Sequence, residues 1–366
     1  MRKEIEELRK KELYRELKEV EGAQDRVIRI EGRELLNFSS NDYLGLAREF
    51  DCRCLERWGG GSGASRLVCG NFTVHRELER RLSELKKTQD SLLFSSGYMA
   101  NLGVISTLAG KGDLILSDEL NHASIIDGIR LSKAERVIYL HRDWEFVRDY
   151  LRKERGNYRR CFIITDSVFS MDGDMAPLKE LFEIKNRYNA ILIIDDAHAT
   201  GVVGWSSLEL FGIEPDASTV VVGTLGKALG TFGAFVCGSS LLREYLINRC
   251  RSFIFTTALP PFIACQTLKN LEKVEERRKR LSELIEFFKR LSGIETSSAI
   301  FPLVIGGERE AVELSRYLFE KGFFVPAIRP PTVKKSRLRI TITAGHKKEE
   351  LRKLWKTIKE FKIKRR

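Results

Sequence analysis

The stretch TVVVGTLGKALG, residues 219–230, decides how we interpret this chain, because it places a lysine among glycines directly after an apolar run. The run at 219–222 is short and rich in valine, which predicts a buried strand of a mostly parallel sheet. Lys227 is therefore expected just past the carboxyl end of that strand. The flanking glycines carry no side chains that would keep a flat ligand away from the backbone.

Two interpretations of Lys227 remain open at this point. A lysine in a confined, partly desolvated place loses part of its preference for the ammonium form and can attack an aldehyde, as a pyridoxal phosphate Schiff base requires. Taken alone, a lysine in a glycine-rich turn is more typical of a solvated loop. A nucleoside-triphosphate loop is excluded, because that motif needs Ser or Thr directly after the lysine and Ala228 stands there.

The composition indicates a folded, soluble protein with a large core. The chain has 366 residues, of which 43% are hydrophobic and 31% charged, enough for two packed lobes and unlike a disordered chain. No stretch approaches membrane-spanning length, so we expect no membrane partner. Residues 1–20 lack a signal-peptide core and predict an amphipathic helix and a cytoplasmic location. The apolar stripe of that helix is Ile5, Leu8, Leu13 and Leu17.

The net charge of +12 raises the possibility of nucleic-acid binding. The basic residues alternate with glutamates along helical stretches at both ends of the chain, as in residues 347–366, which is typical of a solvated helix face. We therefore expect no nucleic-acid partner. A positive surface remains suited to attracting coenzyme A, which carries several phosphate charges.

The seven cysteines are odd in number and scattered, at positions 52, 54, 69, 161, 237, 250 and 265. They form no CxxC pair and have no histidine at ligand spacing, so no metal site is expected. The simplest interpretation is that all seven are reduced thiols in a cytosol.

Short apolar runs alternate with helical segments through the middle of the chain, which predicts a mostly parallel seven-stranded sheet covered by helices on both faces. Ligands of such sheets bind beyond the carboxyl ends of the strands. The runs are Leu92–Phe94, Leu114–Leu116, Val137–Leu140, Cys161–Thr165, Ile191–Ile194, Val220–Val222 and Ala234–Val236.

Other segments complete the expected α/β organisation. We predict a hairpin over Arg26–Phe38 with its turn at Glu31–Gly32, helices over Val74–Lys87 and Phe262–Leu291, and two further strands. Those strands lie near Ile300–Ile305 and Arg337–Thr343. The expected domains are an N-terminal helix and hairpin at 1–37, a large domain at 38–270, and a smaller C-terminal α+β domain at 271–366.

Asp195 follows the apolar run Ile191–Ile194 directly. A carboxylate at the end of a buried strand is costly unless a cation or hydrogen-bond donors meet it. A protonated pyridine nitrogen is one such partner, and the ion pair would keep a pyridoxal cofactor an effective electron sink. The alternative is that Asp195 caps the following turn, which is by itself the commoner role.

Two further places could complete such a site. The segment FSSGY, 94–98, reads as a strand followed by a helix start, and backbone N–H groups at a helix N-terminus bind phosphate well; an ordinary strand-to-helix turn is the alternative. His122 follows another strand end, where an imidazole could stack on a cofactor ring or carry a proton. A single histidine is more often structural, so His122 depends on its neighbours.

With these motifs in one order, the chain resembles the α-oxoamine synthases, pyridoxal-phosphate enzymes that join an amino acid to an acyl-CoA with loss of carbon dioxide. The likeness runs from about Asn37 to Thr343 and implies a fold-type I transferase. It rests on NFSSNDYLGLA (37–47), GSGASRLVCGN (61–71), FSSGYMANLGV (94–104), DELNHASIIDGIRLS (118–132), DSVFSMDGDMAPL (166–178), DDAHATGVVG (195–204), GTLGKALG (223–230), FIFTTALPP (253–261) and AIRPPTV (327–333).

Carried over by motif, the resemblance implies a catalytic set of Lys227, His122, Asp195 and His198. Lys227 would be the Schiff-base lysine, Asp195 the partner of the pyridinium nitrogen and His122 the residue stacked on the ring. Ser167 and His198 would bond the phenolic oxygen of the cofactor, and the phosphate would be held by Gly97, Tyr98 and Thr224. Thr256 and Thr257 would reach in from a second subunit, which implies a homodimer with shared active sites.

The resemblance also assigns substrate contacts. Asn41 and Arg329 would bind the carboxylate of the amino acid, Arg329 in bidentate fashion, and the prolines after Arg329 would fix its backbone. The alternative for Arg329 is an ordinary surface arginine. The arginine that some relatives use near the N-terminus has no clear counterpart, and Arg15 is the candidate for the distal carboxylate of the acyl chain.

Within the family, AIRPPTV and RLVCGN favour the branch of biotin synthesis, whose substrates are L-alanine and pimeloyl-CoA or pimeloyl-acyl carrier protein. The rivals are glycine C-acetyltransferase, which uses glycine and acetyl-CoA, an aminotransferase on the same scaffold, and a partner subunit that has lost catalysis. Retention of the four catalytic residues argues against the last. Ala199 and Cys69 replace the usual glycine and threonine of the family, and both are small enough to have little effect.

Overall fold

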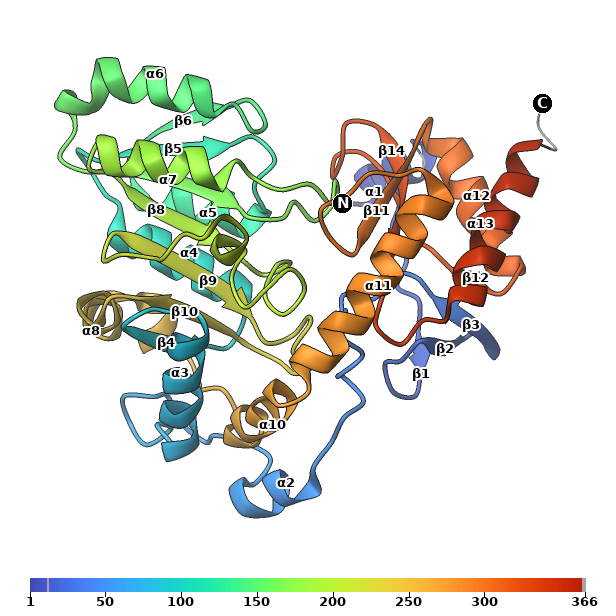
Figure 1. Cartoon of the computed structure of the whole chain (residues 1–366), viewed down its shortest axis with the longest axis horizontal. Helices are drawn as coiled ribbons and strands as arrows, with labels where there is room; N and C mark the ends of the chain where they lie inside the picture. The colour runs from blue at the N-terminus through green and yellow to red at the C-terminus, as the bar shows by residue number, and fades with distance from the viewer. Residues whose placement is uncertain (12, 364–366) are drawn as a thin grey trace. The chain divides into compact units, whose positions relative to one another are not determined.

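The computed structural model describes residues 1–11 and 13–363, and these form two compact units (Figure 1). One unit contains Glu49–Ser170 and Asp174–Glu275. The other contains Met1–Arg48, Met171–Gly173 and Glu276–Arg366. We call them the large unit and the small unit. The N-terminal residues that were expected as a part of their own thus share a unit with the C-terminal segment.

The large unit is built on a seven-stranded sheet with the strand order β4-β10-β9-β8-β7-β5-β6 (Figure 1). Only β10 runs antiparallel to its neighbours, and the pairs β9-β8, β8-β7, β7-β5 and β5-β6 are parallel. All seven predicted strands are confirmed. Their bounds are β4 Asp90–Phe94, β5 Leu114–Asp118, β6 Glu135–Tyr139, β7 Cys161–Asp166, β8 Ile191–Asp195, β9 Thr219–Thr224 and β10 Ala234–Gly238.

Helices cover both faces of this sheet, as its continuously apolar strands require. On one face, α4 and α5 pack against each other and bury a cluster that includes Val104, Ile129, Phe162 and Val222. Burial of such side chains contributes roughly 1.5–3 kcal/mol each. The helices of the large unit are α2 Cys52–Trp58, α3 Thr73–Leu85, α4 Gly97–Leu108, α5 Ala123–Ser132, α6 Trp144–Glu154, α7 Leu178–Arg187, α8 Ser240–Arg249, α9 Arg251–Ile254 and α10 Pro261–Leu271, with short 3-10 turns at Arg155–Asn157 and Ser207–Phe211.

Two glycines are required by close packing in this unit. A Cβ atom on Gly223, at the end of β9, would lie 2.2 Å from Cζ of Phe235. A Cβ atom on Gly128 of α5 would lie 3.1 Å from the carbonyl oxygen of Asn101 on α4. Since ordinary carbon contacts are about 3.5–4.0 Å, glycine allows the strand and the helix to approach their neighbours this closely.

The predicted helix over Phe262–Leu291 is wrong as a single element. The chain forms α10 and then α11, Val274–Ser292, with a break at residues 272–273. At the break, the N–H of Lys273 bonds to the carbonyl of Asn270, three residues back, so the regular α-helical pattern stops. The apolar spacing continues through this point, which is why the sequence pattern does not reveal it.

The small unit contains two small sheets and three of the longer helices. The predicted hairpin is confirmed as β2 Val27–Ile30 and β3 Arg33–Asn37, with both turn residues at positive φ, 54° at Glu31 and 72° at Gly32. The strand β12 pairs with β3 in parallel. The remaining elements are β1 Val20–Glu21, β11 Ile300–Gly306, β12 Phe323–Phe324, β13 Ala327–Ile328, β14 Ser336–Thr341, α11, α12 Glu308–Glu320 and α13 Lys348–Ile363.

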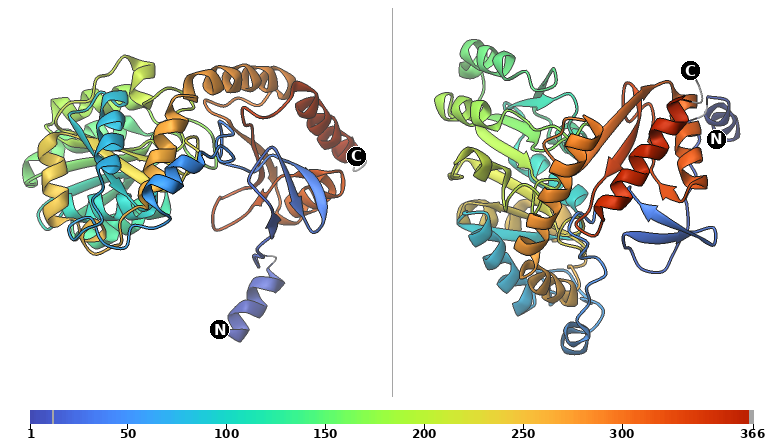
Figure 2. Two further views of the ribbon diagram at one scale, coloured as in Figure 1. Left: turned by 90° about the horizontal axis from the view of Figure 1, so that it is seen from below. Right: turned by 45° about the vertical axis from the view of Figure 1, so that its right-hand side comes forward.

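The N-terminal helix is shorter than predicted. It is α1, Arg2–Lys10, and none of its residues is buried; Figure 2 shows it standing away from the sheets of its own unit. Beyond it, the N–H groups of Leu13 and Tyr14 both bond to the carbonyl of Leu8, and Leu17 is 99% exposed. Leu17 is therefore not packed against the protein, and a helix is not stabilised by burial at this end of the stripe.

The expectation of seven reduced cysteines is corrected by a disulfide between Cys54 of α2 and Cys265 of α10. The two are separated by 211 residues, so their spacing gave no signal. Of the other cysteines, Cys52 and Cys69 are exposed, and three are buried. Within the described residues, no three His, Cys, Asp or Glu side chains gather as a metal site requires. Nor does any described helix combine the length and apolarity needed to cross a membrane.

Candidate active site

Apart from Thr256 and Thr257, which follow α9, the expected site residues of the large unit lie at or after the carboxyl ends of β5, β7, β8 and β9 or at the start of α4. Lys227 lies in the turn between β9 and β10. This turn is closed by hydrogen bonds from the N–H of Leu225 to the carbonyl of Gly233 and from the N–H of Gly230 to the carbonyl of Lys227. These bonds fix the backbone of Lys227 and thereby the direction in which its side chain leaves the turn.

Lys227 and His198 meet at this edge of the sheet. The Nζ atom of Lys227 lies 2.7 Å from Nε2 of His198, and His198 is only 6% exposed. His198 is held by the turn after β8, in which the N–H groups of Ala199 and Thr200 bond to the carbonyl of Asp196. In its ammonium form Lys227 can only donate to Nε2 of His198, whereas in its amine form it can also accept from it.

Asp195 ends β8 and is 7% exposed. Its Oδ1 accepts a hydrogen bond of 2.9 Å from the N–H of Ala197, and its Oδ2 accepts one of 2.6 Å from Nδ2 of Asn101. Two donors make the buried carboxylate tolerable. The bond to Ala197 shows that Asp195 caps the turn after β8, which was the alternative role. The other oxygen of the same carboxylate faces α4. Asn101 was not singled out from the sequence, although it lies within the quoted segment 94–104.

His122 caps the N-terminus of α5. Its Nδ1 lies 3.2 Å from the backbone nitrogen of Ser124 and 2.8 Å from the Oγ of Ser124. A backbone N–H can only donate, so Nδ1 is an acceptor and the ring proton of the neutral form is on Nε2. Burial lowers the pKa of His122, Lys227 acts in the same direction, and Asp195 opposes them. The imidazole is therefore a neutral ring at neutral pH, suited to stacking.

Asp166, which the sequence reading did not select, is a direct neighbour of Asp195. It ends β7 as the register partner of Asp195 on β8, and its Oδ2 accepts a 2.7 Å hydrogen bond from the N–H of His122. Burial raises the pKa of Asp166 well above its usual range, and the Asp195 carboxylate raises it further. The sequence did contain a signal for Asp166, because it directly follows the apolar run Cys161–Thr165, as Asp195 follows its own run.

The start of α4 has the geometry of an anion site. Ser96 caps the helix by accepting from the N–H of Met99, and Gly97 is its first residue. A Cβ atom on Gly97 would meet nothing within 4 Å, so the space beside these N–H groups is open. The hydroxyl of Tyr98 donates to Asp127, and its ring lies edge-on to His122 at 6.3 Å.

The remaining expected cofactor residues differ in their hydrogen bonds and in the elements that carry them; they are Thr224, Ser167, Thr256 and Thr257. Thr224 Oγ1 donates to the carbonyl of Gly233 at 3.0 Å and accepts from the N–H of Gly226. Ser167 is fully buried after β7, and its N–H bonds to the carbonyl of Asp195. Thr256 and Thr257 follow α9, where Ser95 Oγ donates to the carbonyl of Thr257 at 3.2 Å.

The three expected substrate residues all belong to the small unit. Asn41 Oδ1 accepts a 2.9 Å hydrogen bond from Nη2 of Arg339, a buried arginine that the sequence reading missed. Arg329 follows β13 and donates to the carbonyl of Tyr14 at 3.4 Å. Arg15 donates to Thr332 Oγ1 at 3.2 Å. Arg329 and Thr332 thus contact the adjacent residues Tyr14 and Arg15.

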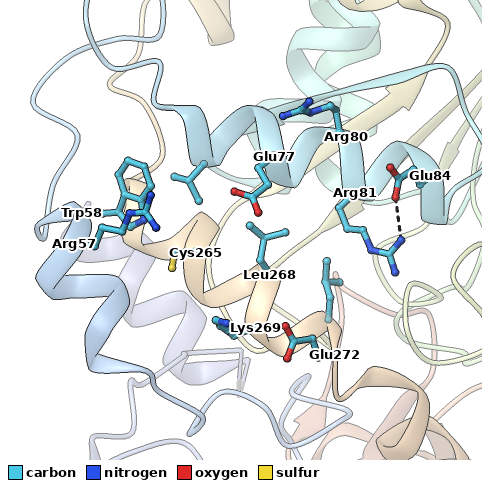
Figure 3. Close-up of a pocket in the computed structure, with 12 residues that line it drawn as sticks. Arg57, Trp58, Glu77, Arg80, Arg81, Glu84, Cys265, Leu268, Lys269 and Glu272 are labelled. Atoms are coloured by element: carbon cyan, nitrogen blue, oxygen red, sulfur yellow. Dashed lines mark hydrogen bonds and ion pairs between the residues drawn. The ribbon is translucent and has the colours of Figure 1, made fainter.

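A separate cavity of about 580 Å³ lies between α2, α3 and α10 (Figure 3). Charged side chains from α3 and α10 point into it, and an ion pair of 3.0 Å joins Arg81 to Glu84. Trp58 and the disulfide-bonded Cys265 form one end. None of the expected site residues lines this cavity, so it does not belong to the site at the strand ends.

Comparison with known proteins identifies what this arrangement is similar to. The family description "Aminotransferase class I and II" matches residues 33–358. The 8-amino-7-oxononanoate synthase of Methylococcus capsulatus is 47% identical over 94% of this chain and 94% of its own length. The putative 8-amino-7-oxononanoate synthase of Thermodesulfovibrio yellowstonii is 43% identical over 96% of this chain and 95% of its own.

Solved structures agree with this similarity. A serine palmitoyltransferase from S. paucimobilis, with a bound pyridoxal phosphate–myriocin aldimine, superimposes with a TM-score of 0.90 at 29% identity, covering 98% of this chain and 95% of that one. The 8-amino-7-oxononanoate synthase of Francisella tularensis gives a TM-score of 0.74 at 31% identity over 91% of this chain and 99% of that one.

Proposed function

The chain belongs to the aminotransferase class I and II family, among the 8-amino-7-oxononanoate synthases, and on that premise we propose how its own residues perform the reaction. The enzyme condenses L-alanine with a pimeloyl thioester, releases carbon dioxide and the thiol, and forms 8-amino-7-oxononanoate for biotin synthesis. The donor is pimeloyl-CoA or pimeloyl-acyl carrier protein.

The residues at the strand ends fit pyridoxal 5'-phosphate, the cofactor of this family. They supply an amine, a carboxylate and an imidazole beside the open start of α4, which suits a phosphate. When bound, the cofactor supplies an electron sink for the negative charge that develops at the amino acid. The observation that carries the proposal is the 2.7 Å approach of Lys227 Nζ to His198 Nε2, at the edge of the sheet where Asp195 is held by two donors.

Each residue would then have a defined role. Lys227 would hold the cofactor through its amine and would also remove the proton from Cα of alanine. Asp195 would hold the ring nitrogen of the cofactor, and the His122 ring would stack on its face. Gly97, Tyr98 and Thr224 hold the phosphate, and His198 and Ser167 lie on the side of the phenolic oxygen. A homodimer in which Thr256 and Thr257 complete the partner's site is part of this proposal.

The substrates are recognised by the small unit. Asn41 and Arg329 bind the alanine carboxylate, for which the arginine offers a bidentate fork. Arg15 binds the distal carboxylate of the pimeloyl chain. A bond forms between Cα of alanine and the thioester carbonyl carbon while the C–S bond breaks, and the thiol leaves with a proton. The carboxyl group of the former alanine then leaves as carbon dioxide, and a proton from water takes its place on Cα.

The test is release of thiol from pimeloyl-CoA with L-alanine, measured beside acetyl-CoA with glycine, on protein loaded with pyridoxal phosphate. We expect release in the first mixture at a kcat/KM at least tenfold above the second. Release mainly in the second mixture would instead make the enzyme a glycine C-acetyltransferase. Absence of release from both, with the acyl carrier protein donor also inactive, would overturn the proposed reaction.

A further inference from the structure

A hydrogen-bonded relay connects Asp195 to His122 through two buried side chains of α4 and α5. Asn101 Nδ2 lies 2.6 Å from Asp195 Oδ2 and 3.0 Å from Ser124 Oγ. Ser124 Oγ lies in turn 2.8 Å from Nδ1 of His122. Asn101 is 1% exposed and Ser124 is fully buried, so water does not compete for these bonds.

The direction of every bond in the relay is determined by chemistry. An ionised Asp195 can only accept, so the atom of Asn101 that faces it must be the amide nitrogen and not the amide oxygen. Both amide hydrogens of Asn101 are then used, one toward Asp195 and one toward Ser124. Since Ser124 Oγ accepts from Asn101, its own hydrogen is free to point at Nδ1 of His122. The amide oxygen of Asn101 has no hydrogen-bond partner among the described residues.

From this geometry we propose that Asn101 is a positioning residue, which holds the Asp195 carboxylate in place and, through the hydroxyl of Ser124, holds the orientation of the His122 ring. The inference rests on the proposed function, because Asp195 and His122 are the residues assigned to the ring nitrogen and the ring face of the cofactor. The new element is that the positions of Asp195 and His122 depend on each other through Asn101. One amide group links the residue that would hold the ring nitrogen to the residue that would stack on the ring.

The local sequence supports a dedicated arrangement. Gly128 lets α5 approach α4 so closely that a Cβ there would lie 3.1 Å from the Asn101 carbonyl oxygen. That approach brings Ser124, one turn earlier on α5, within reach of the Asn101 side chain. Burial of the unpaired amide oxygen of Asn101 costs free energy. The two bonds of its amide nitrogen, to Asp195 and to Ser124, offset that cost and explain why an asparagine stands here.

The test uses Asn101→Leu, which has nearly the shape of asparagine but no hydrogen to donate, and Ser124→Ala. Ser132→Ala is the matched control, because Ser132 is also buried on α5 and its hydroxyl donates to the carbonyl of Ile129, outside the relay. The full chain without cofactor is labelled with 15N-histidine, and the ring signals of His122 are assigned with a His122→Asn variant. We expect both Asn101→Leu and Ser124→Ala to shift the Nδ1 signal of His122 in the same direction, and Ser132→Ala to leave it unchanged.

A second readout separates the relay from the proposed function. Pyridoxal phosphate is titrated into each protein, with binding followed by tryptophan fluorescence. We expect Asn101→Leu to weaken binding at least tenfold relative to wild type, and Ser124→Ala to weaken it less, because it leaves the bond to Asp195 intact. Failure of the wild type to bind would contradict the proposed function alone. A His122 signal in Asn101→Leu that matches wild type would overturn the relay, whatever the affinities are.

Discussion

Asp166 and Asp195 end two adjacent parallel strands as register partners, and both carboxyl groups are buried. Two buried carboxylates this close cannot both be ionised at low cost. Asp195 is the one that receives two hydrogen-bond donors, and the pKa of Asp166 is raised well above its usual range by burial and by Asp195. At this edge of the sheet, burial and the neighbouring Asp195 thus favour the neutral form of Asp166.

Asp166→Asn should make the protein less sensitive to alkaline pH. A raised pKa in the folded state means that stability is present below the unfolded-state pKa and is lost as pH rises toward the folded value, by at most about 1.4 kcal/mol per pH unit. Asparagine imitates the neutral acid and can still accept from the N–H of His122. Thermal unfolding of the cofactor-free proteins between pH 5 and 9 should show that the melting temperature of the variant increases relative to that of wild type as pH rises. A difference that stays constant with pH would show that Asp166 is ionised in the fold.

Lys227→Ala should lower turnover with L-alanine and pimeloyl-CoA by about a thousandfold or more, because both proton transfer and cofactor attachment depend on its amine. Thiol release and circular dichroism would be measured together. Lys111→Ala, which removes an exposed lysine of the same unit, should retain wild-type turnover. Substantial activity in Lys227→Ala would contradict the assigned mechanism.

His141→Asn should remove a contribution to stability that depends on pH. Burial opposes the charge of His141, but hydrogen bonds to Asp118 and Asp174, at 3.1 and 2.9 Å, raise the pKa of its imidazole to about 9. The contribution is complete below about pH 6.5 and is lost as pH rises through 9. Urea unfolding of both proteins should show the advantage of wild type falling by about 2 kcal/mol between pH 6 and pH 9.5. An equal advantage at both pH values would mean that His141 is not charged.

The disulfide between Cys54 and Cys265 should make stability sensitive to reductant. Protein unfolded without reductant should titrate five thiols, the number of free cysteines. Reduction should destabilise wild type by about 2–4 kcal/mol and lower its melting temperature, whereas the Cys54→Ser/Cys265→Ser protein should not respond. Seven titratable thiols in the protein as isolated would restore the expectation of fully reduced cysteines.

Several features of this protein were determined by the sequence alone. Each of the seven central strands was visible as a short apolar run, because a strand buried on both faces needs apolar residues on both sides of its pleat. Asp195, Lys227 and His122 were visible for a related reason: Asp195 directly follows such a run and the other two lie within six residues of one, so all three are near strand ends, where parallel sheets bind ligands. The family motifs then supplied the reaction and its substrates.

Only the tertiary structure decided which of these residues meet and what else is present. The relay from Asn101 to Ser124 and the pairing of Asp166 with Asp195 depend on helix packing and strand register, which relate positions 23 or more residues apart. The disulfide joins positions 211 residues apart, and the end of α10 depends on a hydrogen bond at Lys273. Apolar periodicity reports only which face of an element is buried, so it carries no information on which partner side chain is found across the interface.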